Sequence, residues 1–304
     1  MPRFAGHNPN SMSFLRFDRL MTLYCARPLV SAGLVSRGAT LPILMYHSIS
    51  DRREPGISPY FGTTTSPAVF ERQMIFLRDN GFRAVTISEA MTALRDRHAG
   101  NEKLVAITFD DGFRDFYDLA FPILKRLRFT ATMYLPASFI SDSRKNFKEK
   151  ECMSWRQVRE LRNEGIAFGS HTLSHPRLYE LRWKEIETEL ARSKEQIEDE
   201  LGERVNDFAY PYAFPQQDRP FAVRFSALLK AQGYDTCVTT MIGRARAGDD
   251  PFRLKRLPLN DWDDDVLLAA KLNGAYDWLA LPQDVFKRAK QLLPSYQRLV
   301  AEEA

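Results

Sequence analysis

Strand and helix patterns alternate along most of the chain, and this order constrains the fold more than any other feature. The segment KLVAITF (103–109) is apolar on both faces, as strands of a buried parallel sheet are. Repeated β-α-β order over this length predicts an α/β fold, either a (β/α) barrel or an open parallel sheet. The other expected strands span residues 42–49, 83–87, 131–136, 166–171, 207–212, 235–240 and 253–259.

The expected helices lie between these strands, and several carry clear end signals. Ser66 with Pro67 begins a helix that Gly81 ends, and Ser88 is expected to cap the next helix, which runs to about His98. Ser154 is expected to cap a helix that reaches Asn163. Further helices are predicted over 115–127, 182–201, 220–232 and 283–300, and residues 137–152 are interpreted as an irregular polar loop.

The 304 residues suit one large domain, because no repeat or low-complexity linker divides the chain. Residues 1–40 are interpreted as an N-terminal extension, and residues 41–304 as the main domain with its C-terminal helix. Within the extension, residues 14–24 are expected to form an amphipathic helix that packs on the domain surface. The alternative is that this helix docks as a peripheral element on the inner face of a membrane. The pattern makes no prediction of the oligomeric state.

Composition and charge exclude several classes of protein. The net charge of +4 is spread along the chain, so no basic stripe for nucleic acid is expected. Cys25, Cys152 and Cys237 lie far apart without C-x-x-C spacing, which favours reduced thiols. Charged residues such as Arg16 and Arg19 interrupt the N-terminal apolar residues, so neither a signal peptide nor a transmembrane helix is recognised. A cytoplasmic location is therefore expected.

The stretch ITFDDGF (107–113) follows the strongest strand with two adjacent carboxylates, Asp110 and Asp111. Side chains of a regular strand alternate between faces, but Gly112 permits an irregular turn that could bring both carboxylates to one rim. Two converging carboxylates repel each other unless a cation neutralises them. A plain surface turn is the alternative interpretation of this stretch.

Two histidines four residues apart, His171 and His175, follow a second strand in FGSHTLSH. In a helical turn, positions i and i+4 share one face, so both imidazoles could reach one point. Divalent zinc binds neutral imidazoles, and two histidines with one carboxylate leave open positions for water and substrate. The second carboxylate could then act as a base. Surface or structural histidines are the alternative.

The order TFDDG then SHTLSH resembles the polysaccharide deacetylases, which share the NodB-homology domain and form carbohydrate esterase family 4. The resemblance extends from about Leu41 to Trp262, and MYH near the start is similar to the poly-N-acetylglucosamine deacetylases. It implies a distorted (β/α) barrel of about seven strands. The implied chemistry is metal-dependent hydrolysis of an acetyl group on a sugar. The implied cofactor is a divalent metal, Zn²⁺ first, with Co²⁺, Ni²⁺ and Mn²⁺ as alternatives.

Residue roles follow from the resemblance. Asp110 would be the general base, and Asp111, His171 and His175 would be the metal ligands. The backbone N–H of Tyr212, in AYPY (209–212), would bind the oxyanion and help to position the substrate.

The chain departs from the family pattern at two places. Ala209 stands where the family has an arginine that orients the base, and Arg256 or Lys255 could supply the missing charge. The chain has no histidine after His175, where the family carries its catalytic acid. His47 follows the first strand, which neighbours the last in a closed barrel, and is therefore assigned as the general acid. A buried structural histidine is the alternative.

NDWDDD (260–265) resembles the family's substrate-pocket stretch, so Asp261 and Trp262 are candidates to line a sugar pocket. The alternative is a helix N-terminus at which acidic residues are favoured. The sequence thus predicts a hydrolase that removes an acetyl group, with N-acetyl favoured, from an oligosaccharide, polysaccharide or lipid-linked glycan. A hydrolase of another small amide or cyclic imide, and a non-catalytic glycan-binding protein, are the alternatives.

Overall fold

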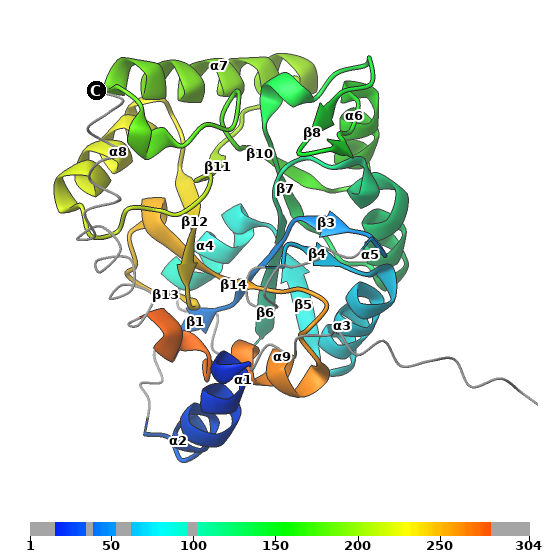
Figure 1. Cartoon of the computed structure of the whole chain (residues 1–304), viewed down its shortest axis with the longest axis vertical. Coiled ribbons are helices and arrows are strands. Elements are labelled where there is room, and N and C mark those ends of the chain that lie inside the picture. The colour runs from blue at the N-terminus through cyan, green and yellow to red at the C-terminus, as the bar shows by residue number, and fades with distance from the viewer. Residues whose placement is uncertain (1–15, 35–38, 53–61, 97–101, 281–304) are drawn as a thin grey trace, which may run out of the picture.

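Seven parallel strands close into a barrel in the computed structural model of the chain (Figure 1). The structure describes residues 16–34, 39–52, 62–96 and 102–280. Strand β2 pairs with both β14 and β6, and this pairing closes the ring. The order around the ring is β2 (Ile43–Tyr46), β14 (Leu254–Pro258), β12 (Thr236–Ile242), β11 (Asp207–Ala209), β10 (Ala167–Ser170), β7 (Thr132–Leu135) and β6 (Lys103–Phe109). The predicted distorted (β/α) barrel of about seven strands is confirmed.

Shorter strands lie outside the seven-stranded ring. β5 (Phe82–Val85) adds to the first half of β6 in parallel. Three two-stranded pairs lie outside the ring: β1 (Thr40–Leu41) with β13 (Ala245–Arg246), β3 (Ser48–Ile49) with β4 (Thr64–Thr65), and β8 (Asn146–Phe147) with β9 (Lys150–Glu151). The last pair corrects the sequence interpretation, because residues 137–152 contain this antiparallel hairpin rather than an irregular loop throughout.

Helices surround the barrel, and most follow the sequence prediction (Figure 1). They are α3 (Pro67–Asp79), α4 (Ile87–Arg95), α5 (Phe121–Leu127), α6 (Trp155–Asn163), α7 (Trp183–Leu201), α8 (Arg219–Ala231) and α9 (Asp265–Leu272). Ser154 caps α6 in a capping box with Gln157, as expected for its sequence. The predicted cap at Ser88 is wrong: Thr86 caps α4 through a capping box with Glu89. The predicted helix over 283–300 lies outside the described residues.

The strands place one set of side chains inside the barrel and the other under the helices. Along β6, Val105, Ile107 and Phe109 join the large apolar cluster beneath the helices. Leu104 and Ala106 face the opposite way, into a second cluster that includes Leu41, Ile43, Ala209, Val238 and Leu254. Helix α4 contributes Ile87, Ala90, Met91 and Leu94 to this second cluster. One end of the barrel is thus closed by α4.

The described part of the N-terminal extension is helical and packs on the barrel surface. It runs through α1 (Phe17–Met21), the π-helical turn η1 (Thr22–Ala26) and α2 (Arg27–Ser31). Its contacts are with α9 and the residues that follow it, at the lower end of the view in Figure 1. Across the described ranges, no helix combines the length and the apolar character needed to cross a bilayer.

Candidate active site

The predicted site residues gather where the barrel strands end. Asp110 and Asp111 follow β6, and His171 and His175 follow β10. His47 comes directly after β2. The carboxyl ends of parallel strands meet at one rim of a barrel, which is where such folds build their sites.

Asp110 continues the inward alternation of β6 and forms a buried ion pair with Arg256 on β14. The guanidinium nitrogens Nη1 and Nη2 donate to the two carboxylate oxygens at 2.7 Å each. Burial would raise the pKa of Asp110, but the charge and the hydrogen bonds of Arg256 outweigh it and lower the pKa to about 2. Of the two candidates for this charge, Arg256 makes the contact, because Lys255 precedes it in the strand and points to the other face.

Left-handed backbone conformations, rather than a regular helical turn, bring the three candidate metal ligands together. Asp111 has φ 74° and Gly112 has φ 63°, so the extended conformation of β6 ends here. This change of direction keeps the Asp111 side chain at the rim of the barrel. Thr172 (φ 69°) and His175 (φ 57°) bend the second segment, which is not helical. The predicted helical turn is therefore wrong. Non-glycine residues in this conformation typically cost about 1–3 kcal/mol each and tend to cluster at functional sites.

The three side chains fit a divalent cation. Nε2 of His171 and Nε2 of His175 lie 3.7 and 3.3 Å from Oδ1 of Asp111, and 3.2 Å from each other. Oδ1 of Asp111 is buried and has no hydrogen-bond partner among the described residues. Nδ1 of His171 is 2.7 Å from the carbonyl oxygen of Ala209; the proton that it donates there leaves the Nε2 lone pair facing the cluster. Two imidazoles and one carboxylate are a donor set that suits zinc.

Electrostatics keep two of these ligands, Asp111 and His171, in their metal-binding protonation states. Burial lowers the pKa of His171 to about 3, so its imidazole is neutral near pH 7. Burial acts to raise the pKa of Asp111, but the His175 imidazole 3.3 Å away and the nearby His47 and Lys148 hold that pKa well below its usual range. A carboxylate and a neutral imidazole are the forms that bind metal.

Lys148, which the sequence reasoning missed, reaches the cluster from the β8–β9 hairpin. Its Nζ donates to Oδ2 of Asp111 at 3.0 Å and lies over the rings of Phe147 and Tyr212. Lys148 and Glu149 both have positive φ, as the central residues of a type I′ hairpin turn do. Phe147 in turn packs against the His175 ring, with 4.9 Å between centroids. No sequence motif marks this lysine, because the hairpin brings it over the site from outside the barrel.

His47 lies beside the carboxylate of Asp110. Its Nε2 is 3.8 Å from Oδ2 of Asp110, and its side chain is 20% exposed. Burial lowers the pKa of His47, although Asp110 and Asp111 act in the opposite direction. This position puts an imidazole and the candidate base on the same side of the candidate site.

Tyr212 closes another side of the cluster. It has φ 57°, and its ring lies 4.7 Å from the His175 ring. The Tyr212 carbonyl accepts a hydrogen bond from the Thr240 hydroxyl at 2.9 Å, which fixes this backbone turn. The exposed tyrosine ring and the ring of His175 thus share one edge of the candidate site.

The segment that carries Asp261 and Trp262 contains the helix start of the alternative interpretation. Oδ1 of Asp261 accepts the backbone N–H of Ser66 at 2.6 Å, so this carboxylate ties the segment to the start of α3. Asp264 caps α9 by accepting the N–H of Leu267, which is the helix-start alternative. The Trp262 side chain is 60% exposed and available to a ligand, and its sugar-binding role stays a prediction.

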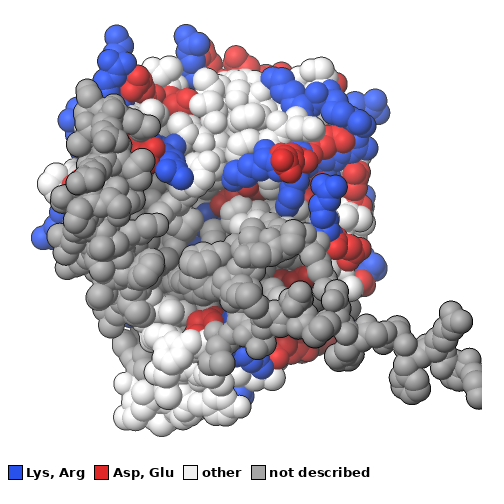
Figure 2. Space-filling model, in the orientation of Figure 1, with Lys and Arg blue, Asp and Glu red and all other residues white. Residues whose placement is uncertain are grey.

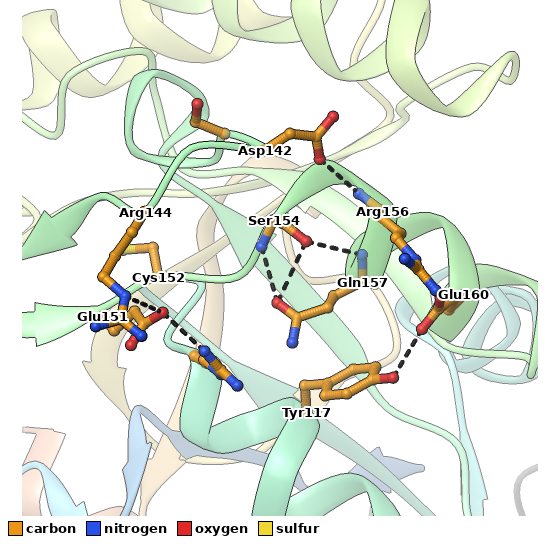
Figure 3. A pocket seen from close by; sticks show the side chains of 11 residues that line it. Tyr117, Asp142, Arg144, Glu151, Cys152, Ser154, Arg156, Gln157 and Glu160 are labelled. Carbon is orange, nitrogen blue, oxygen red and sulfur yellow. Dashed lines mark hydrogen bonds and ion pairs between the residues drawn. The ribbon is translucent and has the colours of Figure 1, made fainter.

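A separate polar pocket of about 380 Å³ lies beside the β8–β9 hairpin and α6 (Figure 3). Arg114 and Arg144 both pair with Glu151 in its wall. The other polar groups are paired in the same way: Tyr117 and Arg156 both bind Glu160, while Ser154 and Gln157 form the capping box of α6. Because these groups satisfy one another, we assign no chemistry to this pocket.

The family model described as polysaccharide deacetylase matches residues 97–235. A curated relative is YxkH of Bacillus subtilis (strain 168), a provisionally named polysaccharide deacetylase. It is 31% identical over 219 residues, which are 72% of this chain and 71% of the relative. The poly-beta-1,6-N-acetyl-D-glucosamine N-deacetylase of Escherichia coli (strain K12) is 30% identical over 138 residues, 42% of this chain but only 20% of that protein.

Two solved structures have the same architecture over most of the chain. The deacetylase PplD of Streptococcus pyogenes, in complex with acetate, matches with a TM-score of 0.67 and 25% identity, covering 78% of this chain and 99% of that one. IcaB from Ammonifex degensii matches with a TM-score of 0.64 and 28% identity, covering 78% of this chain and 98% of that one.

Proposed function

This chain belongs to the polysaccharide deacetylase family, and from that premise we propose that it is a metal-dependent hydrolase of acetylated glycans. The proposed substrate carries an N-acetylhexosamine unit. One observation carries the proposal: the buried Asp111–His171–His175 cluster lies directly beside the Asp110–Arg256 ion pair. A cation-binding set and a buried carboxylate base are the two parts of a metal-assisted amide hydrolysis.

The proposed cofactor is Zn²⁺, held by Asp111, His171 and His175, with Co²⁺, Ni²⁺ and Mn²⁺ as alternatives. When bound there, the cation would polarise the acetyl carbonyl and lower the pKa of a neighbouring water.

The chain's own residues would perform the proton transfers. Asp110 accepts a proton from the water that attacks the acetyl carbon, and its low pKa keeps it ionised beforehand. The N–H of Tyr212 donates to the developing oxyanion. As the C–N bond breaks, protonated His47 donates to the leaving nitrogen, and acetate and an amino sugar depart. Asp110 then releases its proton to solvent and His47 takes one up, which returns both groups to their starting states.

The substrate class is supported by the relatives and by the exposed Trp262. The E. coli and Staphylococcus aureus proteins named poly-beta-1,6-N-acetyl-D-glucosamine N-deacetylase are similar to this chain. An exposed indole at the rim offers a flat apolar plate to a pyranose ring. We therefore propose β-1,6-linked N-acetylglucosamine oligomers as the first substrates to test.

The experiment measures acetate released from these oligomers by the full chain, before and after chelation and after Zn²⁺ is restored. We expect release to stop on chelation and to return with metal. Asp110→Asn should lower the rate by roughly 10²–10⁴-fold while metal is still bound. Asp118→Asn is the matched control, since Asp118 is an exposed acid near the same motif that pairs with Arg114 instead. Full activity of the metal-free protein would contradict the proposal.

A further inference from the structure

The helical segment 17–31 turns polar side chains toward the rest of the domain and apolar side chains toward solvent. A surface helix of a soluble protein normally turns its apolar stripe to the core and its polar face to water. Here the two buried residues of the segment are Asp18 and Thr22, four positions apart on one face. The outer face carries Phe17, Leu20 and Tyr24, spaced by three and four residues.

Polar bonds to the barrel fix this orientation. Tyr276 donates to Oδ2 of Asp18 at 2.8 Å, and the indole N–H of Trp278 donates to the Thr22 hydroxyl at 3.0 Å. Arg19 binds both oxygens of Asp264 at 2.8 Å each. Since three separate residues hold the inner face, the segment cannot roll to bury its apolar side without breaking these bonds.

The exposed apolar side chains are concentrated on this segment. Eleven large hydrophobic side chains are exposed in the described part of the chain, and five of them fall within residues 17–34. Figure 2 shows a mostly uncharged surface at the lower end of the view, where α1 and α2 lie in Figure 1. The five are Phe17 (62%), Leu20 (44%), Tyr24 (75%), Leu29 (50%) and Leu34 (74%). Exposed apolar surface gathered in this way marks an interaction site.

The charges around these side chains favour an anionic lipid surface as the partner. Residues 1–38 contain a single acidic residue, Asp18, and it is buried beneath the helix. Of the five arginines in the same residues (Arg3, Arg16, Arg19, Arg27 and Arg37), Arg16 and Arg19 are held in ion pairs with Asp18 and Asp264. Arg27 is exposed on the segment itself. Apolar and aromatic side chains combined with arginine, and without carboxylates, are typical of helices that lie in a membrane interface.

We propose that residues 17–34 dock this protein on the surface of an anionic membrane. Phe17, Leu20, Tyr24, Leu29 and Leu34 enter the headgroup boundary, and Arg27 binds lipid phosphates. The polar anchors to Asp264, Tyr276 and Trp278 keep the barrel attached to the docked helix. The proposal does not depend on the proposed activity, because none of residues 17–34 belongs to the candidate active site.

Vesicle flotation of the full chain tests this proposal. Vesicles of phosphatidylcholine with phosphatidylglycerol are compared with vesicles of phosphatidylcholine alone. We expect binding to the anionic vesicles, and a loss of about tenfold or more for the triple variant Phe17→Ser, Leu20→Ser, Tyr24→Ser. The matched control replaces three exposed residues elsewhere, Leu119→Ser, Tyr179→Ser and Val223→Ser, and should bind as the wild type does.

Arg27→Gln provides a second variant that leaves the apolar face and the anchors intact. It should weaken binding to anionic vesicles several-fold and have no effect with phosphatidylcholine alone. Wild-type protein that stays unbound, or a triple variant that floats like the wild type, would overturn the proposal. So would a dimer in light scattering that the triple variant abolishes without any vesicle binding, because the face would then join two copies of the chain.

Discussion

Arg256 binds both carboxylate oxygens of Asp110 at 2.7 Å, although 146 residues separate them in sequence. Both side chains are almost fully buried, at 0% and 2% exposure. The Arg256 Nη1 also donates to the Thr108 hydroxyl, and its Nε donates to the Thr239 carbonyl. The guanidinium thus lies inside the barrel and holds the Asp110 carboxylate in position. It supplies the charge of the arginine that the family resemblance leads us to expect at position 209, where this chain has Ala209.

Removal of this arginine should harm both stability and activity. We expect Arg256→Met to lower the free energy of unfolding by about 3–5 kcal/mol, because Asp110 is left as an unpaired buried charge. The pKa of Asp110 should rise for the same reason, so deacetylation should also fall. Chemical denaturation and acetate release measure the two effects. The double variant Arg256→Met, Asp110→Asn should recover part of the stability and none of the activity; no recovery of stability would argue against an uncompensated charge.

The proposed role of His47 as general acid can be tested by changing the leaving group. His47→Asn should slow release of acetate from an N-acetyl sugar by roughly 10²–10⁴-fold. It should have little effect on 4-methylumbelliferyl acetate, whose leaving group needs no proton from the protein. The measurement is the rate loss on the N-acetyl sugar divided by the rate loss on the ester. This ratio is compared between His47→Asn and Asp110→Asn. Equal losses on both substrates would show that His47 acts before the C–N bond breaks.

Lys148 places a positive charge 3.0 Å from a proposed metal ligand, which should work against a second cation. We expect Lys148→Met to bind Zn²⁺ several-fold more tightly in calorimetry, because that repulsion disappears. Deacetylation should nevertheless slow, since the developing oxyanion loses one of its nearby cations. Lys145→Met is the control, as Lys145 bonds the Ser138 carbonyl on the outside of the hairpin. Weaker zinc binding in Lys148→Met would mean that the lysine mainly orients Asp111.

Asp207, at the start of β11, should make stability depend on pH away from the candidate site. Burial raises the pKa of Asp207 to about 6. The hydrogen bond that the Thr236 hydroxyl donates to this carboxylate at 2.6 Å acts in the opposite direction and lowers the pKa. The unfolded chain has a lower pKa, so the protonated form favours folding. That stabilisation is complete below about pH 4 and is lost as the pH rises through about 6.

Asp207→Asn mimics the protonated carboxyl and should remove this loss. The variant should gain up to about 2–3 kcal/mol over the wild type between pH 4 and pH 8. Denaturant midpoints measured across that range, with the exposed Asp199→Asn as control, test the expectation. A constant difference between wild type and variant at all pH values would show that Asp207 keeps the same charge throughout.

The strand and helix order could be predicted from local patterns, because KLVAITF and the other strands are apolar and the helices carry capping residues such as Ser154. The family resemblance likewise selected Asp110, Asp111, His171 and His175 as one group, since two short motifs carry all four. Only the tertiary structure, however, brings these four side chains together. Positive φ at Asp111 and His175 turns the side chains together, where strand and helix geometry alone would not.

Contacts between distant strands were decided only by the closed barrel. The sequence left Arg256 and Lys255 as equal candidates to replace the missing arginine, and the inward register of β14 decides between them. Lys148 had no motif, because its position depends on a hairpin folded back over the rim. Residue types and their local order thus determine the elements and the chemistry on offer. Ring closure, strand register and loop conformation determine which side chains meet, since these depend on pairings between residues far apart in the chain.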